Sequence, residues 1–228
     1  MPGSSSSSAR QNCCPCCEVC NYVSGLQDTG NAWPGTTTDS EGHVCGTDMY
    51  WKANGVDARI VNRIPPYGWG CSYAVWISDV CDGDTDTALD NGGLDGKEII
   101  FSIDFFIAEH ACLDRIVISG EYSADNYVKE GEWKVNGIDQ CQIYHGTFYN
   151  TLGLGCIPFE ITAEQGGFGH GVNTVEITVK NGYYGVGEYG GPHLFKMRWA
   201  CFDRLDMPEE SSSSSSCVTE PDDREEED

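Results

Sequence analysis

The chain has 228 residues, of which 13 are cysteine and 28 are glycine, and its 36 acidic and 13 basic side chains give a net charge of −23. This turn-rich, acidic composition argues against a helical bundle, and it argues against nucleic acid as a partner, which needs clustered Lys and Arg. No run approaches the roughly 20 apolar residues of a membrane helix, so the sequence predicts no membrane span. The first thirty residues show no secretory signal, which leaves the export route open.

Serine runs near both ends predict flexible, low-complexity termini. We assign residues 1–20 to a Ser- and Cys-rich N-terminal arm, residues 21–205 to one domain, and residues 206–228 to a Ser-rich, acidic tail. From Asp206 onward there are ten acids and one base, so this tail carries nine of the net negative charges.

Between the two tails, apolar residues recur with the period of two that is typical of β-strands. The runs are residues 58–62, 73–78, 99–107, 115–121, 132–135, 142–148, 157–161, 174–180 and 193–200. No convincing helix separates them, and parallel strands would need long crossover connections, so the strands should pair antiparallel. The predicted fold is all-β: a two-sheet antiparallel β-sandwich of jelly-roll type.

Several short segments, taken in order, form a recognisable series: residues 22–25 (YVSG), 46–51 (GTDMYW), 74–78 (AVWIS), the strand at 99–107, 118–126 (ISGEYSADN), 133–137 (WKVNG) and 171–181 (GVNTVEITVKN). Over residues 21–202 the series resembles the galactose-binding-like sandwich domain of bacterial exported proteins, many of which carry a PEP-CTERM sorting tail. The sorting tail itself is absent, since residues 207–210 (MPEE) run into serines and acids. The resemblance implies an extracellular, non-catalytic fold and names no ligand.

Thirteen cysteines are many for 228 residues, and an odd number leaves at least one without a partner in the same chain. Eight are scattered singly, as sandwich disulfides are, whereas residues 13–20 contain overlapping Cys-x-x-Cys spacings that can also hold zinc. We predict disulfides within and between chains, with metal binding or free buried thiols as the alternatives. The candidate cross-linking residues lie on the two arms: Cys13, Cys14, Cys16, Cys17, Cys20 and Cys217.

Residues 82–90 hold the densest oxygen-ligand sequence, in which Asp82, Asp84, Asp86 and Asp90 form a candidate calcium site. The spacing is not that of an EF-hand, and a solvated acidic turn is the alternative. No other cofactor is predicted. The five histidines are far apart and no nucleophile motif accompanies them, so we predict no enzyme activity.

Aromatic side chains beside Gly- and Pro-rich segments supply the argument for ligand binding, since they can form flat platforms for sugars or for a protein surface. The candidates are Trp33, Trp51, Trp69, Tyr183, Tyr184 and Tyr189. The alternative is that they are half-buried packing residues.

Two functions are compatible with these patterns. The first is a non-catalytic structural subunit that self-associates, or joins assembly partners, in an extracellular or surface filament, sheet or virion-like particle stabilised by disulfides. The second is a carbohydrate-binding or adhesion module, stabilised by calcium, whose partner is a glycan. Cysteines on both arms favour the first, because cross-links make an assembly irreversible.

Overall fold

A computed structural model of the protein describes residues 18–31, 37–38, 44–61, 74–81, 98–125, 127–140, 156–180 and 194–206. The strands are β1 (Val23–Ser24), β2 (Thr37–Thr38), β3 (Val44–Ala53), β4 (Val56–Ile60), β5 (Ile77–Ser78), β6 (Glu98–Ile107), β7 (Ile116–Asp125), β8 (Tyr127–Val135), β9 (Ile138–Asp139), β10 (Ile157–Thr162), β11 (Gly171–Lys180) and β12 (Leu194–Asp203). Short 3-10 turns accompany them: η1 (Val19–Tyr22), η3 (Leu113–Arg115), η4 (Ala163–Gln165) and η5 (Arg204–Asp206).

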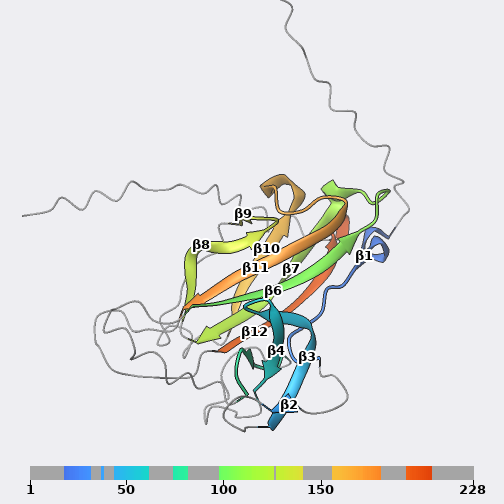
Figure 1. Ribbon diagram of the computed structural model, residues 1–228. Coiled ribbons are helices and arrows are strands. Elements are labelled where there is room, and N and C mark those ends of the chain that lie inside the picture. The colour runs from blue at the N-terminus through green and yellow to red at the C-terminus, as the bar shows by residue number, and fades with distance from the viewer. Residues whose placement is uncertain are drawn as a thin grey trace, which may run out of the picture.

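The strands form one strongly curled sheet in the order β10-β7-β12-β5-β4-β3-β6-β11-β8-β9. Every described strand pair is antiparallel. The sheet folds back on itself, so that β6, β11 and β8 lie in front of β7, β10 and β12 (Figure 1). The predicted all-β, antiparallel, sandwich-like fold is confirmed.

Alternating side chains explain β6 and β11, two neighbouring strands of ten residues each. Along β6 the apolar residues at the odd positions from Ile99 to Ile107 are buried, whereas the side chains between them are partly or fully exposed. β11 pairs with β6 over ten residues and buries Val175, Ile177 and Val179 on the same face. This is the pattern of a sheet with one face against a core and the other toward solvent.

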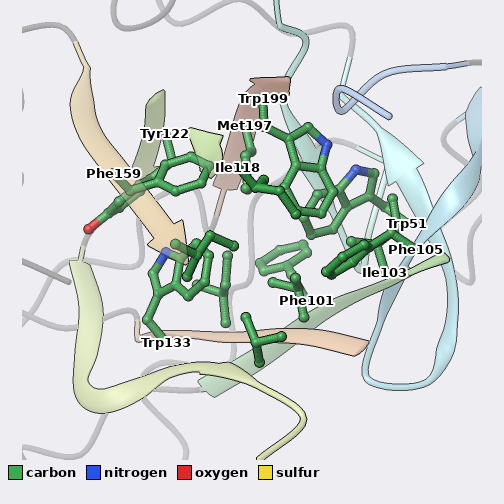
Figure 2. Close-up of a cluster of buried hydrophobic side chains, with 14 of the residues drawn as sticks. Trp51, Phe101, Ile103, Phe105, Ile118, Tyr122, Trp133, Phe159, Met197 and Trp199 are labelled. Carbon is green, nitrogen blue, oxygen red and sulfur yellow. The ribbon is translucent and has the colours of Figure 1, made fainter. Parts of the chain in front are cut away.

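Aromatic side chains from the two layers meet in the core (Figure 2). The rings of Phe101 and Phe195 stack with centroids 5.2 Å apart, and those of Trp133 and Phe159 are also 5.2 Å apart. Because large aromatic rings bury the most apolar area per residue, these contacts between β6 and β12 and between β8 and β10 hold the layers together.

The structure corrects two details of the predicted strands, and a third predicted strand is not tested. β3 is a ten-residue strand that the alternation did not identify, since the polar Asp48 is fully buried in it and its pairing with β4 shifts register between Thr47 and Lys52. In the segment 73–78 only Ile77 and Ser78 form a strand among the described residues. The predicted strand at 142–148 lies outside the described residues.

Candidate functional site

Disulfide bonds are the main chemical feature of the described chain. Cys20 is bonded to Cys201 with Cα atoms 5.5 Å apart, and Cys45 to Cys81 with Cα atoms 5.3 Å apart. Cys112 and Cys156 are also disulfide-bonded, so each of the six cysteines in the described ranges is oxidised. The prediction of intrachain disulfides is therefore confirmed for these residues, and such bonds persist in a non-reducing environment.

The position of Cys20 corrects the predicted arm. Cys20 was expected to link neighbouring subunits, but its sulfur is bonded to Cys201 of the same chain. Val19 beside it is 1% exposed and belongs to the core, so the fold begins before residue 21. Because the Cys20 sulfur is held in this disulfide, it is not a free thiolate and cannot bind zinc together with the other cysteines of residues 13–20.

The segment that follows β1, residues 27–31, joins elements far apart in the sequence. Thr29 exchanges backbone hydrogen bonds with Met197 and Val75: its N–H donates to the Met197 carbonyl (3.0 Å), and its carbonyl accepts from the Val75 N–H (3.2 Å). Its hydroxyl donates to the Val75 carbonyl (2.7 Å) and accepts from the Met197 N–H (3.1 Å). Thr29 is 3% exposed, so one threonine fastens β12 to the segment before β5.

Two buried tryptophans and a buried carboxylate hold the same segment. The indole N–H groups of Trp51 and Trp199 both donate to the Gln27 carbonyl, at 2.9 and 3.0 Å. The carboxylate of Asp48 accepts hydrogen bonds from the backbone N–H groups of Gly30, Tyr50 and Trp51, at 2.6, 2.9 and 2.9 Å. A buried charge is tolerated when its oxygens are hydrogen-bonded in this way, so Asp48 has a structural role.

Trp51 corrects the predicted aromatic platform. It was expected in a loop as a ligand-binding ring, but it lies in β3 with no exposed surface and packs against Phe195 and Trp199, with ring centroids 5.5 and 6.1 Å apart. Figure 2 shows the Trp51 and Trp199 rings side by side within the core. A ring without exposed surface offers no face to a sugar.

Lys196 is a buried cation on the other side of β12. Its Nζ lies 4.8 Å from the centroid of the Trp76 ring, and the residue is 4% exposed. Burial lowers the pKa of Lys196 to about 8, and the nearby charge of Glu121 opposes this shift. Trp76 belongs to a small second core with Val61 and Leu194, so Lys196 packs beside an apolar cluster.

The described histidines occupy ordinary packing positions. The His110 ring packs edge-on against Tyr22 with centroids 4.5 Å apart, and a ring nitrogen of His170 lies 2.9 Å from the Ala111 carbonyl oxygen. Among the described residues, no group of three or more His, Cys, Asp or Glu side chains is placed to hold a metal ion. These ranges also contain no helix long and apolar enough to cross a membrane.

Most predicted site residues lie outside the ranges that the structure describes, and the hypotheses built on them stay predictions. They comprise the calcium candidates Asp82, Asp84, Asp86 and Asp90, the aromatics Trp33, Trp69, Tyr183, Tyr184 and Tyr189, and the cysteines Cys13, Cys14, Cys16, Cys17 and Cys217.

Comparisons with protein-family models, curated proteins and solved structures find no match for this chain. The resemblance to the galactose-binding-like domain of exported proteins therefore stays a prediction.

Sequence reasoning missed the network around residues 27–31 and the buried Lys196. The network joins Thr29 to Met197 and Gln27 to Trp199, separations that no local pattern reveals. The sequence did contain a signal for Lys196, because this residue interrupts the apolar run of residues 194–197 (LFKM). The structure buries all four of these residues, so both faces of β12 are covered there.

Proposed function

We propose that this chain is a non-catalytic structural subunit of an extracellular or surface assembly, made rigid by disulfides within the subunit and linked to a neighbouring subunit by a cysteine outside the described residues. What supports this proposal is the state of the cysteines. Each of the six described cysteines is already disulfide-bonded, and thirteen is an odd number. The cysteine left over must be one of seven: Cys13, Cys14, Cys16, Cys17, Cys71, Cys141 and Cys217.

A leftover thiol in a non-reducing environment pairs with another chain or stays reactive. Five of the seven candidate positions lie within 17 residues of the N-terminus or in the acidic C-terminal tail. A cross-link at either place raises the effective concentration of the next subunit. This supports covalent assembly of folded subunits.

The carbohydrate-binding alternative has less support. Its candidate aromatics lie outside the described residues except Trp51, and Trp51 is fully buried. The two roles differ in an observable way, because a structural subunit must assemble, whereas a carbohydrate-binding module can work as a monomer.

Electron microscopy and size-exclusion chromatography of protein purified without reductant test the proposal. We expect fibres or particles that shorten or disperse when a dithiol is added. A monodisperse monomer, with or without retention on a polysaccharide column, would contradict it.

Cysteine variants locate the link. Cys217→Ser and a variant with serine at all four cysteines of residues 13–17 should each be compared with Ser216→Ala, which changes the residue beside Cys217, removes no thiol and serves as the control. Assembly should fail in one of the first two and persist in the control. Persistence in both arm variants would move the link away from the arms and refute this form of the proposal.

A further inference from the structure

Two hairpins of the fold have closely similar seven-residue sequences. Residues 51–57 at the β3–β4 turn read WKANGVD, and residues 133–139 at the β8–β9 turn read WKVNGID. The two segments differ only by Ala against Val and by Val against Ile. The tryptophan that opens each is fully buried, and Figure 2 places Trp51 and Trp133 on opposite sides of Phe101.

The two turns also have the same conformation. Both asparagines have a φ of 52°, and the glycines after them have φ of 80° at Gly55 and 77° at Gly137. Positive φ at both central residues is the requirement of a two-residue type I′ hairpin turn, which explains why Asn-Gly stands at both places.

Each asparagine then docks on the next strand in the same manner. The Asn54 N–H donates to the Ile100 carbonyl (2.9 Å), and the Asn54 Oδ1 accepts from the Ile100 N–H (3.0 Å). The Asn136 N–H donates to the Thr174 carbonyl (2.8 Å), and the Asn136 Oδ1 accepts from the Thr174 N–H (2.9 Å). One hairpin is thereby fixed to β6 and the other to β11.

The register of β6 with β11 relates the two hairpins by rotation. Ile100 stands two residues before Ser102, Thr174 stands two residues before Glu176, and Ser102 is directly opposite Glu176 in the antiparallel pair. A two-fold axis through the Ser102–Glu176 pair therefore exchanges β6 with β11 and one hairpin with the other.

A row of side chains across six strands is symmetric about the same axis. Directly opposite partners place these residues side by side in the order Asp57, Lys52, Ser102, Glu176, Lys134 and Asp139. Apart from the central pair, the row has the same residue types from either end. Lys52 forms an ion pair with Asp57, and Lys134 forms one with Glu132.

The symmetry extends to the other layer. The axis exchanges β3 with β8, β4 with β9, β5 with β10, β6 with β11 and β7 with β12. Under this exchange the β3–β4 and β3–β6 pairs become the observed β8–β9 and β8–β11 pairs, and the β5–β12 pair becomes the observed β10–β7 pair. The β6–β11 and β7–β12 pairs map onto themselves. The described β4–β5 pair has no counterpart between β9 and β10 among the described pairings, so the curled sheet is open there.

We propose that the sandwich consists of two copies of one five-strand unit, β3–β7 and β8–β12. A two-fold axis relates the two units, as it relates the subunits of a symmetric dimer. In this arrangement β6–β11 and β7–β12 are the isologous contacts, the same surface of each unit meeting itself. The duplication concerns how the sandwich is built, and it holds whether or not the chain assembles as proposed above.

Matched asparagine variants test the equivalence of the two units. Asn54→Ala and Asn136→Ala each remove an acceptor for a strand N–H and a residue suited to positive φ, so each should lower the thermal midpoint by about 3–6 °C. Asn21→Ala, at an exposed asparagine that is hydrogen-bonded to the nearby Glu18, is the control and should leave the midpoint unchanged. A clear loss in one hairpin with none in the other would overturn the proposal.

An exchange across the axis is the sharper test. Ser102→Glu alone places two carboxylates directly opposite each other and should lower the midpoint by about 1–3 °C. Adding Glu176→Ser gives the same row of residues read from the other end, so the double variant should return to within about 1 °C of the wild type. A double variant as unstable as Ser102→Glu alone, or less stable, would contradict the symmetry.

Discussion

Removing the disulfide between Cys20 and Cys201 should destabilise the fold strongly without changing any core ring. The bond joins residues 181 apart in sequence, from η1 to the end of β12. In the chain-entropy treatment, a loop of this length restricts the unfolded chain by about 5 kcal/mol, and measured disulfides commonly contribute about 2–4 kcal/mol. We expect Cys20→Ala/Cys201→Ala to lower the free energy of unfolding by about 3–5 kcal/mol. Both residues must change together, because one remaining thiol can pair elsewhere.

Urea unfolding without reductant measures this loss. The slope of the unfolding free energy with urea should also rise, because the unfolded chain becomes less compact once the cross-link is gone. The control is the wild type and the variant measured in a dithiol, where the difference should disappear. A loss under about 1 kcal/mol, or a difference that persists in the dithiol, would show that the cross-link is not what holds η1 to β12.

Three further changes test the packing. Gly120→Ala should prevent folding, since a Cβ there would clash with the backbone carbonyl oxygen of Arg198 in β12, whereas Gly169→Ala, which meets nothing within 4 Å, should express normally. Trp51→Phe should lower the free energy of unfolding by about 2 kcal/mol or more through lost ring volume and a lost hydrogen bond to Gln27, measured by urea unfolding. The depressed pKa of Lys196, about 8 in the folded chain, means that the unfolded chain binds more protons above that pH, so stability should rise between about pH 8 and 10. Lys196→Met should abolish that rise, and an unchanged pH profile would exclude Lys196 as its source.

The sequence predicted the strands whose two faces differ. β6 and β11 alternate because one face meets the core and the other is largely exposed, and the alternation located both within three residues. β3 escaped detection because its buried positions include a carboxylate, Asp48, which a pattern of apolar residues cannot register. Asp48 is tolerated there only through three backbone N–H groups that the fold brings to it.

The candidate site was less predictable, because its parts come together from distant segments. Disulfide pairing follows spatial proximity, so nothing near Cys20 in the sequence indicates Cys201 as its partner. Trp51 stands between residues that also occur in loops, and only the burial of β3 distinguishes a core ring from a platform. The repeated WKxNG segments, in contrast, are visible in the amino-acid sequence itself, where a comparison of the chain with itself finds them.

The central claim, that subunits are linked covalently through the odd cysteine, is tested most directly by intact-mass measurement of the native protein. The material is isolated without reductant, with free thiols blocked by an alkylating agent at lysis. We predict a mass that is a multiple of the chain, reduced to the single-chain mass by a dithiol. A single-chain mass that carries one blocking group, with every other cysteine paired within the chain, would contradict the account.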